Sequence, residues 1–321
     1  MKEIWLLADG DEWEEVKASL RDAIELGFDG AILKAEFLEK AKKLGRLALL
    51  PYEELVEVKC AEDQRKALSK DLALLKFSDW KVIPLENIVA MKKGKAIVVV
   101  ENFEDARLAL TVLEKGADGI AVKGSREELK RYFELVKAKE KKIELVRAKI
   151  KEIRPLGLGD RVCVDTVSLM TPGEGMLVGN RASFMFLVAS ESEESEYVAS
   201  RPFRVNAGSV NAYLKVGEKT RYLSELKAGD EVEIVRFDGS VRKSYVGRVK
   251  IEKRPLILIV AEANNDEGSV ILQNAETIKL VNPEGRHRSI SELKIGEEVL
   301  VWVGEKGRHF GVSVDEFVIE R

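Results

Sequence analysis

Residues 96–124, AIVVVENFEDARLALTVLEKGADGIAVKG, contain two short apolar runs on either side of a segment with helical spacing. The runs over 96–100 and 119–122 have the length and the valine and isoleucine content of strands. Between them, apolar residues recur at three- and four-residue spacing, and Gly116 closes the helical pattern. A strand, a helix and a second strand in this order predict a βαβ unit with parallel strands.

The same alternation fills the chain from residue 1 to about residue 145. We expect strands over 3–9, 29–35, 55–60, 80–85, 96–102 and 118–124, and helices over 13–27, 36–45, 61–75, 86–94, 103–116 and 125–146. Six such units predict a parallel sheet covered by helices. We favour a barrel-like arrangement over an open, doubly wound sheet.

Beyond Ile153 the helical period gives way to alternation of apolar and polar residues with recurrent glycine turns, which is typical of antiparallel strands. Three segments, 156–164, 226–234 and 293–301, share the pattern Leu-x-x-Gly-acid-x-Val. They predict three similar β-units of about seventy residues in a barrel or sandwich, with each Gly-acid pair in a turn. The expected fold class is therefore α/β plus β, with a βα-repeat domain over 1–152 and a β-rich domain with an internal three-fold repeat over 153–321.

Composition restricts the class of protein. The 321 residues are too many for one ordinary core, and 34% of them are charged, with a net charge of -3. Because no basic tract is present, we expect no nucleic-acid partner. Apolar runs such as 256–260 are too short to cross a bilayer, and the first residues do not resemble a signal peptide, so we expect a cytoplasmic protein without a membrane partner.

Few residues are available for a metal centre of nitrogen and sulfur ligands. Cys60 and Cys163 are the two cysteines and lie far apart in the sequence, and the chain has 2 histidines. We expect free thiols and no zinc site. The sequence leaves two questions open: whether carboxylates bind magnesium, and whether the protein is a homo-oligomer.

Charged residues follow the expected parallel strands: Asp9, Lys34, Lys59, Glu101 and Lys123. Ligands of parallel α/β sheets bind at the carboxyl ends of the strands. Three lysines and two acids at one edge suit an anionic substrate and proton transfers, although such charges can also do no more than solvate strand ends. No strand is followed by GxGxxG, the usual dinucleotide-binding sequence.

Two segments interrupt the β-repeats. The first, 168–180, contains Gly173, Gly175 and Gly179, whose amides could bind an anion, and Glu174, which we expect to be exposed. A flexible hairpin tip is the alternative.

The second segment, 201–208, contains Arg201 and Arg204 within four residues. Two neighbouring arginines suggest an anion site, because a guanidinium group binds a carboxylate or a pyrophosphate with two hydrogen bonds. Asn206 offers a donor and an acceptor on an expected tight turn. Near the C-terminus, His309 is either a general acid or base or a structural hydrogen-bond donor.

Long motifs of the C-terminal half resemble the archaeal-type, type II 3-dehydroquinate synthases. They are DTVSLMTPGEGMLVGNRASFMFLVASES (165–192), YVASRPFRVNAGSVNAYL (197–214), GRVKIEKRPLILIVAEA (247–263), LQNAETIKLV (272–281) and GRHFGVSVDEFVIE (307–320). The N-terminal half is similar but less distinctive. The resemblance implies NAD-dependent oxidative deamination of 2-amino-3,7-dideoxy-D-threo-hept-6-ulosonate and its cyclisation to 3-dehydroquinate in the shikimate pathway.

The resemblance lets us assign roles as hypotheses. Gly173, Glu174, Gly175 and Asn206 would contact the cofactor, and Arg201, Arg204 and Asp165 would bind the substrate. Lys34 or Lys123 would act as the base, with a pKa lowered by neighbouring lysines and partial burial. Glu101 and His309 would transfer protons in the cyclisation.

Two alternatives are kept. One is an aldolase or lyase that acts on a small anionic sugar acid through a Schiff base or a metal ion. The other is a non-catalytic module that binds an anionic metabolite.

Overall fold

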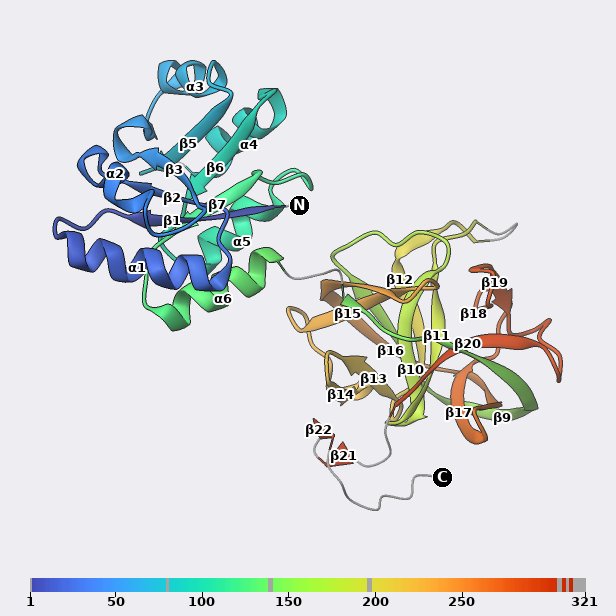
Figure 1. Ribbon diagram of the computed structural model, residues 1–321. Coiled ribbons are helices and arrows are strands. Elements are labelled where there is room, and N and C mark those ends of the chain that lie inside the picture. Colours follow the sequence, from blue (N-terminus) through green and yellow to red (C-terminus); the bar gives the residue numbers. More distant parts are fainter. Residues whose placement is uncertain are drawn as a thin grey trace. The chain divides into compact units, whose positions relative to one another are not determined.

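The computed structural model describes residues 2–78, 81–137, 141–194 and 198–304, with the backbone of strands β21 (Arg308–His309) and β22 (Val312–Ser313). The chain forms two compact units, Met1–Lys139 and Glu140–Arg321 (Figure 1). The boundary expected between 152 and 153 falls inside β9 (Val146–Thr166). The first unit ends earlier because its last helix, α6 (Arg126–Lys137), stops short of the helix expected over 125–146.

The N-terminal unit contains a seven-stranded parallel sheet in the order β3-β2-β1-β7-β6-β5-β4. Its strands are β1 (Glu3–Ala8), β2 (Gly30–Leu33), β3 (Ala48–Pro51), β4 (Val56–Val58), β5 (Leu72–Phe77), β6 (Lys95–Val99) and β7 (Gly119–Val122). Followed from β1 in both directions, this order matches the chain order around a barrel, with β3 and β4 at the two edges. The sheet is therefore a curled, half-barrel structure, which confirms the barrel-like βα-repeat fold.

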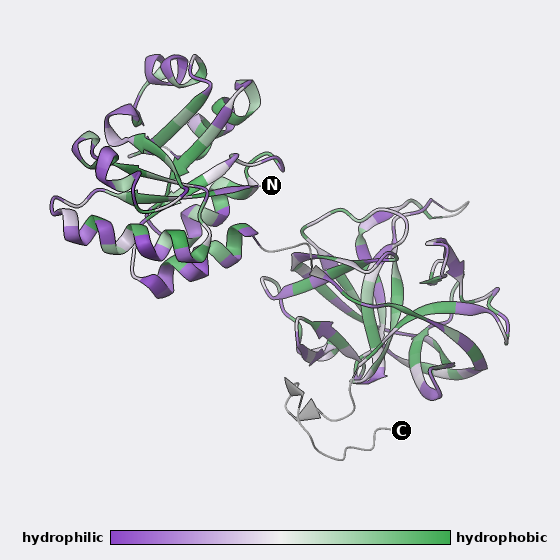
Figure 2. Ribbon diagram, viewed as in Figure 1, coloured by the Kyte–Doolittle hydropathy of each residue, from purple (hydrophilic) through white to green (hydrophobic). Residues whose placement is uncertain are grey.

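Both faces of this sheet are buried. Alternate residues such as Ile4, Leu6 and Val98 pack into the core shared with the helices, whereas Trp5 and Ile97 point to the opposite face and form a smaller core. The helices are α1 (Trp13–Leu26), α2 (Leu38–Ala41), α3 (Ala61–Leu68), α4 (Val82–Met91), α5 (Phe103–Thr111) and α6. Burial on both faces explains why the strands are continuous apolar runs, as their colour in Figure 2 shows.

Two expected elements of the N-terminal unit are wrong. The segment expected as a strand over 80–85 lies in α4 from Val82 onward. Pro84 lies in the first turn of α4, where a proline is tolerated because its missing N–H would have no partner there. The helix expected over 61–75 ends at Leu68, and strand β5 follows. Lys92 Nζ donates to the carbonyl of Ala67 at 3.3 Å and so satisfies the end of α3.

The C-terminal unit is an antiparallel sheet of 13 strands, which confirms the β-rich second domain. Besides β9, they are β8 (Lys141–Lys142), β10 (Glu174–Arg181), β11 (Phe184–Glu191), β12 (Arg201–Ser209), β13 (Tyr213–Val216), β14 (Lys219–Tyr222), β15 (Glu231–Arg236), β16 (Ser240–Ala263), β17 (Asp266–Gln273), β18 (Lys279–Val281), β19 (His287–Ser289) and β20 (Glu298–Val303). The long strands β9 and β16 pair from Thr166↔Val246 to Lys149↔Glu262. Phe184 and Phe186 are fully buried in its core.

The sequence repeat corresponds to structure in two of its three copies. Hairpins β13–β14 and β18–β19 each precede a turn, in which Gly229 has φ 90° and Gly296 has φ 94°, and then a strand, β15 or β20. The first Gly-acid pair, Gly159 and Asp160, lies inside β9 instead of in a turn. Gly159 is explained by packing, because a Cβ at this position would lie 2.5 Å from Leu256 Cδ1.

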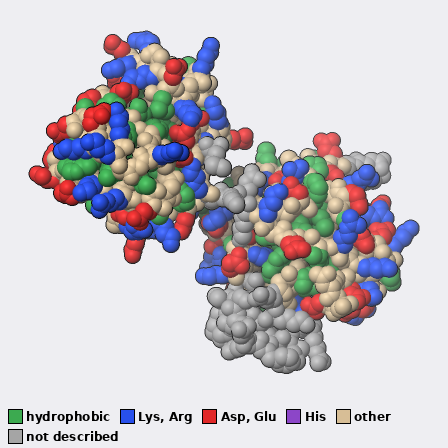
Figure 3. Space-filling model, viewed as in Figure 1, with side chains coloured by type: hydrophobic (Ala, Val, Ile, Leu, Met, Phe, Trp, Pro, Cys, Tyr) green, Lys and Arg blue, Asp and Glu red, His purple; other side chains and the backbone are tan. Residues whose placement is uncertain are grey.

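In the part of the chain that the structure describes, no helix combines the length and the apolar character that crossing a bilayer requires. Figure 3 shows basic and acidic side chains interspersed over the visible surface of both units.

Candidate functional site

In the N-terminal unit, the carboxyl ends of the strands bring charged side chains together. Asp9 follows β1 and Lys123 follows β7, and Lys123 Nζ lies 2.9 Å from Asp9 Oδ2. Lys34, after β2, forms an ion pair with Asp11. The charge of Asp9 acts on both lysines, and that of Glu101 acts on Lys123. Four of the five expected residues therefore influence one another at this edge, which is the usual ligand side of a parallel sheet. The fifth, Lys59, follows β4 and pairs with Glu57 at 2.7 Å.

The protonation of the two candidate lysines differs from the expectation. A hydrogen bond to Asp11 raises the pKa of Lys34, and a hydrogen bond to Asp9 raises the pKa of Lys123. The expected lowering of these pKa values is wrong because carboxylates, not other lysines, are their nearest charged neighbours. Burial lowers the pKa of Lys2 and Lys92, neither of which lies at the carboxyl ends of the strands.

Glu101 lines two pockets of this unit. One pocket also contains Lys81 and Asp105 against an apolar wall, and the other contains Arg131 and Tyr132. Lys81 Nζ binds Asp105 Oδ2 at 2.9 Å. The charge of Glu101 helps to raise the pKa of both Lys81 and Lys123. Glu101 is thus an exposed carboxylate whose charge reaches two lysines.

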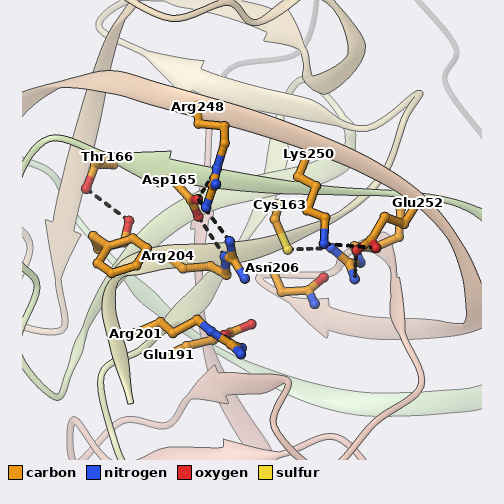
Figure 4. Close-up of polar contacts among 12 residues, drawn as sticks. Cys163, Asp165, Thr166, Glu191, Arg201, Arg204, Asn206, Arg248, Lys250 and Glu252 are labelled. Carbon is orange, nitrogen blue, oxygen red and sulfur yellow. Dashed lines mark hydrogen bonds and ion pairs between the residues drawn. The ribbon is translucent and has the colours of Figure 1, made fainter. Parts of the chain in front are cut away.

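In the C-terminal unit, three neighbouring strands present a polar face, which we call the three-strand face. It consists of Arg204 and Asn206 of β12, Cys163 and Asp165 of β9, and Arg248, Lys250 and Glu252 of β16 (Figure 4). Arg161 of β9 also belongs to it. The ladder places Asp165 between Arg204 and Arg248, and Cys163 between Asn206 and Lys250. Because side chains alternate along a strand, Val162 and Val164 of β9 point the other way, into the core.

Asp165 is held by two guanidinium groups. Arg204 donates to its two oxygens at 2.6 and 2.9 Å, and Arg248 donates to Oδ2 at 2.9 and 2.5 Å. Burial opposes ionisation of Asp165, but the hydrogen bonds from both arginines outweigh it and keep its pKa below the usual range. The hydrogen bond to Asp165 raises the pKa of Arg204. The side chain of Arg248 is 62% exposed, so its positive charge reaches the surface.

The other end of the three-strand face also has more cations than carboxylates. Glu252 pairs with Arg161, Lys250 and Arg254, each at 3.0 Å. Asp165 and Glu252 are thus two carboxylates that pair with five cations: Arg204, Arg248, Arg161, Lys250 and Arg254. Cys163 lies beneath them, where burial raises the pKa of its thiol to about 11. The thiol is therefore neutral at physiological pH, and the face as a whole is positive and suits an anionic ligand.

The two arginines predicted from the sequence differ in environment. Arg204 is mostly buried and its hydrogen bonds go to Asp165. Arg201 pairs with Glu191 at 3.2 Å, and its side chain is 43% exposed. The charge of Glu191 also acts on Arg204 and Cys163, so this acid adjoins the three-strand face.

The glycine loop is organised by contacts within the protein. The amide of Gly173 donates to His287 Nε2 at 2.8 Å, and the amide of Glu174 donates to the carbonyl of Thr171 at 3.0 Å. A Cβ on Gly175 would lie 1.9 Å from the carbonyl oxygen of Val188, so the close approach of β10 and β11 requires this glycine. The predicted cofactor contact through these amides gains no support from their geometry.

Glu174 is buried, contrary to the expectation that it is exposed. Its carboxylate accepts hydrogen bonds from Arg242 at 3.1 and 3.0 Å and from the amide of Thr171 at 2.7 Å. Burial opposes its ionisation, but these hydrogen bonds outweigh that effect and lower its pKa. Glu174 therefore stabilises the loop from inside.

Asn206 lies in strand β12, so the expected tight turn is wrong. Its Nδ2 donates to Gln273 Oε1 at 3.0 Å, whereas its buried Oδ1 has no partner among the described residues. The Asn206-Ala207-Gly208 segment contains a register shift of β12 against β9 in place of a turn, and Gly208 there has φ 123°. The side chain of His309 lies outside the described residues.

Sequence reasoning missed Arg161, Arg248 and Lys250. Arg248, Lys250 and Glu252 stand at alternate positions of one strand, and Arg161 and Asp165 do so on its neighbour. Charges at every second position of a strand share one face, so this spacing was the available signal.

Comparisons with known proteins match the whole chain. A family model described as the 3-dehydroquinate synthase II N-terminal domain matches residues 1–137, and one described as the 3-dehydroquinate synthase II C-terminal domain matches residues 147–321. The chain is 71% identical to the 3-dehydroquinate synthase of Archaeoglobus fulgidus and 45% identical to that of Methanothrix thermoacetophila. It is also 45% identical to the 3-dehydroquinate synthase homolog of Aquifex aeolicus. Each of these three comparisons covers 100% of both chains.

Proposed function

Because the chain belongs to the 3-dehydroquinate synthase II family, we propose that it makes 3-dehydroquinate for the shikimate pathway of aromatic amino-acid biosynthesis. The proposed substrate is 2-amino-3,7-dideoxy-D-threo-hept-6-ulosonate, which undergoes NAD-dependent oxidative deamination and cyclisation. The enzyme is then an oxidoreductase that acts on a CH–NH2 donor. A cytoplasmic location and a homo-oligomer stay predictions.

The excess of cations on the three-strand face carries this proposal. Arg204 and Arg248 share the single carboxylate of Asp165, so their ion-pair group carries one more positive charge than negative. Substrate and cofactor both carry negative groups, a carboxylate and a pyrophosphate, that bind guanidinium groups with paired hydrogen bonds. Arg248 is the exposed member of the pair and can reach such a ligand, whereas the buried Arg204 fixes Asp165 in place.

The residues of this face fit NAD. The exposed cations Arg248 and Lys250 would hold the pyrophosphate, and the unpartnered Oδ1 of Asn206 would accept a hydrogen bond from the cofactor. NAD, when bound, accepts a hydride from the amine-bearing carbon of the substrate. The protein itself has to orient the two molecules and manage the protons.

The strand ends of the N-terminal unit carry groups whose chemistry is suited to proton transfer and charge stabilisation. Asp11 and Asp9 keep Lys34 and Lys123 protonated, so these lysines suit binding an anionic oxygen better than acting as bases. Glu101 is then the proton acceptor of this cluster. The raised pKa values give no support to a Schiff-base aldolase, which needs a neutral lysine.

The proposal is tested by mixing the purified protein with NAD and the amino-ulosonate. Absorbance of the reduced cofactor should rise, and 3-dehydroquinate and ammonia should form in equal amounts. A folded protein that produces neither reduced cofactor nor 3-dehydroquinate would rule the proposal out. Borohydride with substrate provides a second check, because it traps a Schiff-base aldolase and leaves the proposed enzyme unmodified.

A further inference from the structure

A second cluster of polar groups in the C-terminal unit lies beside the three-strand face. A pocket after strand β11 is lined by Ser190, Glu191, Glu193, Val198, Ala199, Thr277 and Lys279. Glu191 connects it to the three-strand face, since its charge acts on Arg204. The pocket therefore adjoins the proposed anion site and has carboxylates where that site has cations.

His287, at the start of β19, is completely buried beside this pocket and has one fixed tautomer. A backbone N–H can only donate, so the 2.8 Å contact from the Gly173 amide makes Nε2 an acceptor. Burial lowers the pKa of His287 and keeps the ring neutral, which leaves its proton on Nδ1.

The nearest carboxylate to this Nδ1 is that of Glu193. The two atoms Nδ1 and Oε2 lie 3.4 Å apart without forming a hydrogen bond, so the buried Nδ1 has no hydrogen-bond partner among the described residues. Lys279 binds the same Oε2 at 2.6 Å. Lys279 and His287 thus both approach Oε2, and no described side chain donates to the second oxygen, Oε1.

We propose that Glu193 binds the ammonium group of the substrate through Oε1 and that His287 is its positioning residue. This inference rests on the proposed function, in which the substrate carries an amino group and a carboxylate on one carbon atom. Glu193 would receive the ammonium group, and Arg201, which pairs with the pocket residue Glu191, would receive the carboxylate. The Gly173 loop would then act indirectly, by holding the imidazole beside Glu193.

The test compares the amino substrate with an analogue that has hydrogen in place of the amino group. Calorimetry without NAD measures the affinity of the full-length protein for both compounds. Glu193→Gln should weaken binding of the amino substrate roughly ten- to hundred-fold and leave the analogue unchanged, because only the amino compound loses a charged hydrogen bond. Glu194→Gln is the matched control, since Glu194 is exposed, and it should change neither affinity.

His287→Met separates positioning from folding. Methionine retains an apolar side chain of similar size but offers no donor to Glu193, so the variant should weaken binding of the amino substrate selectively, by less than Glu193→Gln. An equal loss for substrate and analogue would mean that His287 is purely structural and would overturn its assigned role. Unchanged affinity of Glu193→Gln for the amino substrate would overturn the whole inference.

The two proposals fail in different ways. Wild-type protein that prefers the amino compound to the analogue but reduces no NAD would overturn the proposed function and support the ammonium site. Wild-type protein that turns the substrate over while Glu193→Gln keeps its KM would overturn only the ammonium site.

Discussion

Arg204 and Asp165 lie directly opposite each other on strands β12 and β9 and share two hydrogen bonds, of 2.6 and 2.9 Å. The two side chains are 11% and 7% exposed, whereas Arg248, on the other side of the same carboxylate, is 62% exposed. One carboxylate therefore separates an arginine that belongs to the interior from an arginine that faces solvent. The two arginines should differ in what they contribute.

Replacing each arginine by alanine should separate stability from binding. Arg204→Ala leaves a buried carboxylate with one partner fewer and should lower the free energy of unfolding by ~3 kcal/mol. Arg248→Ala removes an exposed partner and should cost less than ~1 kcal/mol, yet it should weaken binding of NADH at least about ten-fold. Urea denaturation and titration of NADH fluorescence measure the two effects. Equal stability losses, with NADH binding unchanged, would remove Arg248 from the proposed site.

Glu174 should stabilise the protein only while it is ionised. Its folded-state pKa is lowered from the ordinary 4.5, so its contribution is present above pH 4.5 and is lost as the pH falls through the folded-state value. Glu174→Gln should therefore be less stable than wild type at neutral pH, and the difference should shrink steadily below pH 4.5. Denaturation curves at several pH values test this. A difference that stays constant down to low pH would show that the carboxylate charge is unimportant.

Lys123 should act as a cation and not as a base. The hydrogen bond to Asp9 raises its pKa, so it stays charged at the pH of the reaction. Lys123→Arg preserves the charge and should retain activity within about ten-fold, whereas Lys123→Met should lose roughly a hundred-fold or more in kcat. If Lys123→Arg is as inactive as Lys123→Met, proton abstraction by Lys123 returns as the explanation.

The general plan of the fold follows from local periodicity, which the sequence displays. Strands such as β6 and β7 are buried on both faces and leave an unmistakable apolar run. The segment around Pro84 was misassigned because its apolar content fits a strand and a buried helix equally, and only the contact of α4 with its neighbours decides between them.

The candidate site was harder to predict because its contacts join distant strands. Arg204 and Asp165 were predicted individually, but their pairing depends on the register of β12 and β9. Glu174 looked exposed between two glycines, whereas Arg242, a residue 68 positions away, binds it in the fold. Local sequence contains no information on such partners, so charge pairs and the pKa values that they set were out of reach.

The two cysteines should differ in reactivity. Cys60 is exposed at the start of α3, whereas Cys163 is buried beneath the three-strand face with a pKa of about 11. Because the thiolate is the reactive form, iodoacetamide should modify one thiol in the native protein and both after denaturation. Mass spectrometry of the labelled peptides identifies the sites. Fast labelling of Cys163 in the native protein would show that the three-strand face opens. Because the thiol of Cys163 is neutral, Cys163→Ala removes no charge and should retain activity.

Gly175, next to Glu174, should be required for strand packing. A Cβ on Gly175 would lie 1.9 Å from the carbonyl oxygen of Val188, whereas a Cβ on Gly217, in the β13–β14 turn, would have no atom within 4 Å. Gly175→Ala should therefore cost at least about 3 kcal/mol, because β10 and β11 have to separate. Gly217→Ala, the matched control, should cost only about 1 kcal/mol for its φ of +61°. Thermal unfolding of both variants decides between two explanations of the loop. A Gly175→Ala protein with normal stability but weak NADH binding would mean that the glycine makes room for the cofactor, whereas a destabilised one means that it makes room for β11.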